Sequence, residues 1–141
     1  MNVSFYLTPK NEVAYVQADH TTAQALKCMK RSGFQTIPVI NEDGSYVGTI
    51  SEGDFLWTLI GDYHRDIEAM DHKLVGSYKA KKDYKAVSID AKIEELRAII
   101  VEQNFVPVVD GRNVFIGIVT RKAVISELIR QKEEREQKIN E

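Results

Sequence analysis

The first 60 residues alternate short apolar runs with helical stripes. Val13-Ala14-Tyr15-Val16 is a short β-prone run that predicts a strand. Thr21, with Gln24 three residues later, has the spacing of a capping box and predicts the start of a helix. Ala25, Cys28 and Met29 follow at helical spacing. Gly33 is suited to end this helix, because glycine adopts a positive φ without strain.

Two further apolar runs and a second stripe complete the pattern. Ile37-Pro38-Val39-Ile40 and Tyr46-Val47-Gly48-Thr49-Ile50 predict two strands, and the Asn-Glu-Asp-Gly segment between them is typical of a hairpin turn. The apolar stripe of Phe55, Leu56, Leu59 and Ile60 then predicts a second helix. We expect Phe55 and Trp57 on this helix to pack in the core or in a dimer contact. The predicted order is β-α-β-β-α.

The same pattern recurs in the second half of the chain. Asp19 precedes Gly33-Phe34 by 14 residues, and Asp90 precedes Asn104-Phe105 by the same 14. On this alignment Asn104 takes the place of Gly33, and the second copy is two residues shorter between its Phe and its Pro. The first helix of the second copy is expected to carry Ile93, Leu96, Ile99 and Ile100, and its last helix to start at about Lys122.

Each copy is too small to bury enough surface for stability on its own, so two copies should pack together, with the sheets against each other and the helices outside. We predict an α/β fold with repeat 1 at residues 7–61, a linker at 62–83, repeat 2 at 84–130 and a charged helix end or tail at 131–141. The structure of the linker is not predicted.

Several short motifs point to one protein family. They are Leu7-Thr8-Pro9-Lys10, Ile37-Pro38-Val39 with the hairpin turn, and Gly48-Thr49-Ile50-Ser51-Glu52-Gly53-Asp54. Val106-Pro107-Val108 and Gly117-Ile118-Val119-Thr120-Arg121-Lys122 are the second copies. Together these motifs resemble the CBS domain, named after cystathionine β-synthase, and the resemblance spans roughly residues 7 to 130. The chain is similar to small stand-alone CBS proteins, some of which bind cyclic di-AMP.

The resemblance implies a pair of repeats, called a Bateman module, related by a pseudo-twofold axis with two clefts between them. In that family the Gly-x-x-Ser/Thr-x-x-Asp stretch of one repeat holds ribose and phosphate. The start of the first strand and the residues before the Pro of the other repeat hold adenine. Such modules usually form flat homodimers and regulate an attached or separate partner, so we expect a homodimer and an unidentified protein partner.

Cleft one, by this resemblance, joins the ribose side of repeat 1 to the base side of repeat 2. Its ribose side has Thr49, Ser51 and Asp54. Its base side has Tyr84, Lys85, Phe105, Val106 and Pro107. The shortening of repeat 2 falls on the base side, so we expect cleft one to be the weaker site.

Cleft two has the reverse composition and is the preferred site. Its base side is complete and is formed by Val13, Ala14, Tyr15, Thr36, Ile37 and Pro38; its phosphate side is formed by Ile118, Thr120, Arg121 and Lys122. Ala123 replaces the ribose-binding Asp, while two cations near a helix N-terminus favour phosphate. A 3′,5′-cyclic dinucleotide has no free 2′,3′-diol, so cyclic di-AMP is favoured slightly over AMP or ATP.

Composition restricts the remaining function classes. The 141 residues carry a net charge of −2, which argues against a nucleic-acid-binding face. The N-terminus is too short and polar for a signal peptide and no apolar run reaches membrane-spanning length, so we expect a cytoplasmic protein. Cys28 is expected to be an inert core thiol, and His20, His64 and His72 lack metal-ligand spacing.

The function predicted is a non-catalytic sensor that needs no cofactor and binds an adenine nucleotide as its regulatory ligand. No phosphate-binding loop or nucleophile–base constellation indicates an enzyme. The alternative is a CBS-fold dimeric scaffold that has lost its ligand, which the shortened repeat 2 and Ala123 support.

Overall fold

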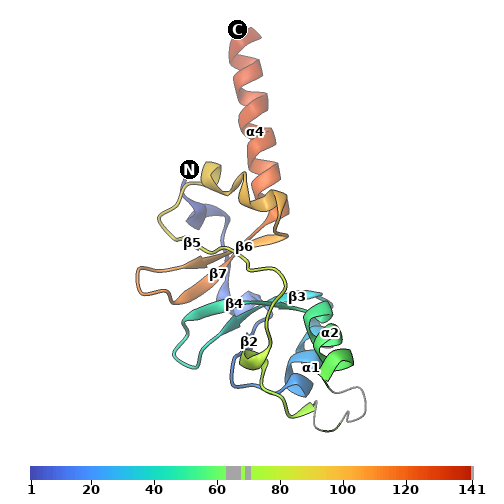
Figure 1. Ribbon diagram of the computed structural model, residues 1–141. Helices are drawn as coiled ribbons and strands as arrows, with labels where there is room; N and C mark the ends of the chain where they lie inside the picture. Colours follow the sequence, from blue (N-terminus) through green and yellow to red (C-terminus); the bar gives the residue numbers. More distant parts are fainter. Residues whose placement is uncertain (63–67, 69–70, 141) are drawn as a thin grey trace.

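The computed structural model describes residues 1–62, 68 and 71–140 (Figure 1). Two sheets lie one beside the other, and the predicted α/β class is confirmed. His64 and parts of the predicted linker and tail lie outside the described residues. Among the described residues, none of the helices combines the length and the hydropathy that a bilayer crossing requires.

Repeat 1 forms a three-stranded sheet with the order β2-β3-β4. Strand β2 (Val16–Gln17) is parallel to β3 (Thr36–Ile40), which is antiparallel to β4 (Tyr46–Ser51). The predicted first strand is therefore shorter than expected and begins only at Val16. Helix α1 (Thr22–Ser32) has the predicted Thr21–Gln24 capping box and ends at Gly33, whose φ is 78°. Helix α2 (Glu52–Asp62) follows β4.

Repeat 2 forms a four-stranded sheet with the order β1-β7-β6-β5. Strand β5 (Val87–Ser88) is parallel to β6 (Phe105–Val109), which is antiparallel to β7 (Phe115–Thr120). The additional strand β1 (Thr8–Pro9) comes from the start of the chain and pairs with β7. Helix α4 (Arg121–Asn140) follows β7 and projects from the body of the molecule (Figure 1).

Five short 3-10 helices complete the described structure. They are η1 (Val3–Tyr6), η2 (Lys10–Glu12), η3 (Val75–Ser77), η4 (Ile93–Leu96) and η5 (Ile99–Val101). The last two stand where the sequence predicts the first α-helix of repeat 2, so that expectation is wrong in helix type. A 3-10 helix rises about 2.0 Å per residue against about 1.5 Å for an α-helix. This segment therefore covers its distance with fewer residues than α1.

The two-residue difference between the repeats lies in this helical segment. Val16 stands opposite Val39 in repeat 1, and Val87 stands opposite Val108 in repeat 2. The first residue of α2 donates its N–H to the Gln35 carbonyl, and the first residue of α4 donates to the Asn104 carbonyl. Asn104 is thus the counterpart of Gln35, and the predicted match of Asn104 with Gly33 is wrong. The base side of repeat 2 is not shortened next to its Pro.

The segment that precedes each repeat packs on the other repeat. The Val3 N–H donates to the Ala91 carbonyl, and the equivalent Val75 N–H donates to the His20 carbonyl, at 2.9 and 2.8 Å. Val3 belongs to the apolar core of repeat 2 and Val75 to that of repeat 1. These matched contacts give the molecule its pseudo-twofold symmetry.

Each repeat has its own apolar core, in which helices cover a sheet. In repeat 1 the buried side chains come from α1, α2 and the strands, and they include Met29, Phe55 and Ile37. In repeat 2 they come from η4, η5, α4 and the strands, and they include Leu96 and Val124. Cys28 is half-buried beside the first core, as expected for a packing residue. Trp57, in contrast, is exposed.

The two hairpins join the repeats through backbone and rings. The Tyr46 N–H donates to the Asn113 carbonyl, and the Phe115 N–H donates to the Gly44 carbonyl, both at 2.9 Å. The rings of Tyr46 and Phe115 stack with centroids 6.2 Å apart. The Tyr46 hydroxyl donates to the Tyr84 carbonyl, and burial raises its pKa above the ordinary range of a phenol.

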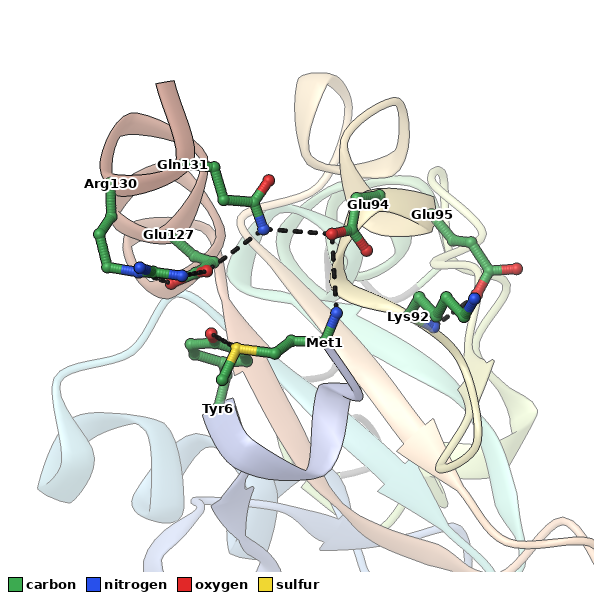
Figure 2. A network of polar contacts seen from close by, with 8 residues as sticks. All are labelled: Met1, Tyr6, Lys92, Glu94, Glu95, Glu127, Arg130 and Gln131. Carbon is green, nitrogen blue, oxygen red and sulfur yellow. Dashed lines mark hydrogen bonds and ion pairs between the residues drawn. The ribbon is translucent and has the colours of Figure 1, made fainter. Parts of the chain in front are cut away.

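A polar network fixes the base of α4 to the N-terminal segment (Figure 2). Glu127 is buried and accepts two hydrogen bonds from the Arg130 guanidinium, at 2.6 and 2.9 Å. Gln131 connects Glu127 to Glu94, which also lies 3.6 Å from the N-terminal amine. The Arg130 hydrogen bonds lower the pKa of Glu127 to about 2.

Candidate functional site

A cavity of about 350 Å³ opens between the repeats at predicted cleft two. Seven of the ten predicted residues line it: Val13, Ala14, Thr36, Ile37, Pro38, Ile118 and Thr120. The first five lie before or on β3 of repeat 1, and the last two lie on β7 of repeat 2. The structure therefore brings together the two chain segments that the sequence analysis assigned to one cleft.

The backbone at Ala14 is open toward this cavity. Among the described residues, neither its N–H nor its carbonyl takes part in a hydrogen bond. Continued by two residues, the parallel register of β2 and β3 sets Ala14 opposite Ile37. The Ala14 carbonyl would then accept from the next residue, Pro38, which has no N–H to donate. An adjacent donor and acceptor are thus free to bind a planar group with the complementary pair.

Three predicted residues lie outside the lining of this cavity. The Tyr15 ring packs against Phe115, with centroids 6.2 Å apart. Arg121 donates from Nε to the Ile100 carbonyl at 2.9 Å, and this bond caps the end of η5. Lys122 is exposed at the start of α4. A phosphate-binding role for Arg121 and Lys122 stays a prediction.

Thr120, the residue directly before α4, lines cleft two. The Thr120 hydroxyl accepts a hydrogen bond from the Ala123 N–H at 3.1 Å, which makes Thr120 the N-terminal cap of the helix. Ala123 stands at the position that Asp54 occupies in repeat 1, so no carboxylate enters the cleft from the first turn of α4. The N-terminal turn of a 20-residue helix favours an anion here.

The cavity has further lining residues that the sequence analysis did not assign to it. They are Thr8, Glu12, Gly33, Phe34, Gln35, Asn104 and Phe105, the last of which had been assigned to cleft one. Thr8 reaches the site because β1 pairs with β7, a long-range contact without a local sequence signal. Phe34 and Gln35 directly precede β3. The sequence assigned the segment before Pro38 to the cleft but did not single out these two residues.

Cleft one also has a cavity, of about 310 Å³, but it covers mainly the predicted ribose side. Thr49, Ser51, Asp54 and Tyr84 line it, whereas Lys85, Phe105, Val106 and Pro107 do not. Val106 is fully buried in the core of repeat 2, and Pro107 is buried beside it. The cavity of cleft one therefore does not reach most of its predicted base side.

Asp54 is occupied by the protein's own backbone. Its two carboxylate oxygens accept the N–H groups of Ser51, at 2.8 Å, and of Lys81, at 2.9 Å. The Ser51 hydroxyl in turn accepts the Asp54 N–H at 3.2 Å, which completes a reciprocal cap at the start of α2. Asp54 could bind a ribose diol only through the lone pairs of its oxygens that these hydrogen bonds leave free.

The base side of cleft one is filled by side chains. Tyr84 is buried, packs on Phe105 with ring centroids 5.0 Å apart, and accepts the Asn104 N–H at 3.3 Å. Gln103 binds both backbone polar groups of Lys85: its Oε1 accepts the N–H at 2.7 Å and its Nε2 donates to the carbonyl at 3.1 Å. Gln103 was not predicted, because the repeats also align with Phe34 matched to Phe105, which hides its position.

Two lysines that the sequence analysis left in an unassigned linker also line cleft one. Lys81 and Lys82 border its cavity next to Trp57. Among residues 1–62, 68 and 71–140, no group of three His, Cys, Asp or Glu side chains is placed to hold a metal ion.

The fold agrees with a comparison to known proteins. A family model described as the CBS domain matches residues 5–61 and again residues 75–130. The chain belongs to the CBS domain family. The predicted pair of CBS repeats is thereby confirmed.

Relatives of this CBS pair include proteins with a stated ligand. The cyclic di-AMP receptor B of Bacillus subtilis is 25% identical over 126 residues, which are 89% of this chain and 85% of the receptor. A crystal structure of CbpB in complex with c-di-AMP has a TM-score of 0.81 and 25% identity, covering 98% of this chain and 91% of the other.

An uncharacterised protein of Methanocaldococcus jannaschii is 30% identical over 127 residues, or 89% of this chain. This chain spans 43% of the length of that relative.

Proposed function

We propose that this CBS pair is a non-catalytic sensor that binds an adenine nucleotide in cleft two and regulates a separate partner protein. The observation that carries the proposal is the open backbone of Ala14 in a cavity that both repeats line. An adenine edge offers an adjacent donor and acceptor, which the free carbonyl and N–H of Ala14 complement. Two relatives whose names or titles include cyclic di-AMP support the ligand class.

Cyclic di-AMP is the ligand that this cleft favours. Ala123 leaves no carboxylate to bind a ribose diol, and a 3′,5′-cyclic dinucleotide has no such diol to offer. A cavity of about 350 Å³ is at the small end of ligand pockets, which span about 300–1,000 Å³. It suits one adenosine unit, with the phosphates directed toward the start of α4, Arg121 and Lys122.

A calorimetric titration of ligand-free protein with cyclic di-AMP, AMP and ATP tests this function. We expect saturable binding, tightest for cyclic di-AMP. If none of the three nucleotides produces heat of binding, the sensor proposal fails and the scaffold alternative takes its place.

The phosphate role has its own test in Arg121→Ala and Lys122→Ala. Loss of a charged phosphate contact should weaken cyclic di-AMP binding several-fold. An affinity that stays within about twofold, a change below about 0.4 kcal/mol, would remove the residue concerned from the site.

We further propose that two copies associate through α2 and α4. Leu56 and Ile60 on α2 occupy positions equivalent to Ile125 and Ile129 on α4, and all four side chains are about half exposed. Two matched apolar pairs suit a symmetric contact in which the same surface of each copy takes part. Sedimentation should give a dimer, and the double variant Leu56→Glu, Ile125→Glu should give a monomer; a monomeric wild-type chain would contradict this arrangement.

A ligand can alter such a dimer only by binding one arrangement more tightly than another. Phe55 and Val124 are buried directly between the sheets and these helices, so they connect the clefts to the proposed contact. A shift in the dimer's dissociation constant with cyclic di-AMP is the expected sign of regulation.

A further inference from the structure

Gln103 makes three hydrogen bonds that close the base side of cleft one. Its Oε1 accepts the Lys85 N–H at 2.7 Å. Its Nε2 donates to the carbonyls of Lys85 and Phe105, both at 3.1 Å. The side chain is only 6% exposed, so these bonds are made away from solvent.

This arrangement has the hydrogen-bonding pattern of a bound base. A primary carboxamide presents one acceptor and one donor side by side, as adenine does along the edge that carries its amino group. Lys85 is the counterpart of Ala14, and its carbonyl lacks a strand partner for the same reason, because Pro107 has no N–H to donate. Gln103 supplies both missing partners from within the chain.

Cleft two has no such group at the equivalent position. The matched hydrogen bonds that make Asn104 the counterpart of Gln35 also make Gln103 the counterpart of Phe34. Phe34 is 58% exposed, lines the cavity of cleft two and has no side-chain polar atom. The Ala14 N–H and carbonyl therefore stay open.

We propose that the Gln103 carboxamide acts as a built-in substitute for adenine, so that cleft one is closed by the protein itself and each chain binds a single adenosine unit, in cleft two. This inference rests on the proposed function for the occupancy of cleft two. The part that Gln103 plays in closing cleft one follows from its own contacts and does not depend on what binds in cleft two. Gln103 and Phe34 are then the residues that decide which cleft accepts a base.

Counting bound AMP in the full-length chain tests this inference. Calorimetry or equilibrium dialysis at saturating AMP should give about one AMP per wild-type chain and two per Gln103→Ala chain, since the variant frees the Lys85 backbone. Gln103→Glu is the matched control, because it keeps the Oε1 acceptor and the volume that block the cleft. It should still bind one.

If Gln103→Ala does not fold, a variant that adds a carboxamide to cleft two tests the inference instead. Phe34→Gln places a carboxamide beside the open Ala14 backbone and should weaken AMP binding at least tenfold, whereas Phe34→Leu should stay within about threefold of wild type. Equal affinities for these two variants would overturn the inference in that case.

The outcomes separate this inference from the proposed function. One AMP in the wild type and still one in folded Gln103→Ala would overturn the built-in substitute and leave the sensor proposal intact. No AMP in the wild type but one in Gln103→Ala would support the substitute and contradict nucleotide binding in cleft two. Two AMP per wild-type chain, or none in either protein, would overturn the substitute.

Discussion

The two clefts have the same backbone arrangement but differ in whether their polar groups already have partners within the protein. In cleft one, Asp54 binds backbone N–H groups and Gln103 binds the Lys85 backbone, so the protein uses its own polar groups. In cleft two, Ala123 and Phe34 occupy the equivalent positions, and the Ala14 backbone has no partner among the described residues. Symmetry of the fold therefore does not make the two clefts equal, because the side chains at a few matched positions differ.

The largest effect is expected where β1 closes against β7, beside cleft two. A Cβ on Gly117 would lie 2.2 Å from the Thr8 carbonyl oxygen, whereas a Cβ on the equivalent Gly48 would have no atom within 4 Å. Gly117→Ala should lower the free energy of unfolding by about 3 kcal/mol and weaken cyclic di-AMP binding, because Thr8 lines the cavity. Urea denaturation measures the first effect.

Gly48→Ala is the matched control for this change. It should alter the free energy of unfolding by less than about 1 kcal/mol. If both alanine variants were equally stable, the close approach of β1 to β7 would not be a constraint on the fold.

A smaller effect is expected from filling cleft two. Ala14→Leu adds apolar volume to the wall of the cavity and should weaken cyclic di-AMP binding at least tenfold, or about 1.4 kcal/mol, with little change in stability. Lys85→Leu, at the equivalent position of cleft one, should leave the affinity within twofold. Comparable losses in the two variants, measured by calorimetry, would mean that both clefts bind nucleotide.

Asp54 should affect stability and not binding. Asp54→Ala removes two charge-assisted hydrogen bonds, one of which caps α2, and should cost about 2 kcal/mol. Asp54→Asn keeps one acceptor and should cost less. Thermal unfolding and calorimetry on the same samples separate the two properties, and a tenfold loss of nucleotide affinity would show that cleft one takes part in binding.

The smallest effect concerns Glu127, a buried residue of α4 that accepts hydrogen bonds from Arg130 and Gln131. Thr58 holds the equivalent place on α2. Folding lowers the pKa of Glu127 from 4.5 to about 2. The ionised carboxylate therefore stabilises the fold fully at pH values above 4.5, the pKa in the unfolded chain. This stabilisation is lost as the pH falls from 4.5 to about 2, the pKa in the folded chain. The melting temperature of the wild type should exceed that of Glu127→Gln at pH 6, and the difference should shrink between pH 4.5 and 2.

A difference in melting temperature that stays constant over this pH range would contradict the proposed contribution of the Glu127 carboxylate. It would leave the comparison of the clefts unaffected.

Much of the fold was predictable because its signals are local. The apolar runs around Pro38 and Pro107, the hairpin turn and the Thr21 cap all appear in the structure close to their predicted places. The 3-10 form of η4 and η5 was not predictable, since their apolar spacing also fits an α-helix. Once the repeats were aligned on their phenylalanines, the role of Gln103 was hidden as well.

The candidate site was predictable in part for the same reason. The repeat motif predicts the segments that meet in cleft two, and seven of the ten residues predicted for that cleft line its cavity. Contributions from distant segments, such as Thr8 from β1, depend on strand pairing that only the folded chain shows. The engagement of Arg121 with the Ile100 carbonyl likewise depends on where η5 ends.

Amide chemical shifts during a titration with cyclic di-AMP test the asymmetry of the clefts most directly. We predict that the largest changes occur at Ala14, Thr36 and Thr120, while Lys85 and Ser51 change little. Changes centred on Lys85 and Ser51, or equal changes in both sets, would contradict the account.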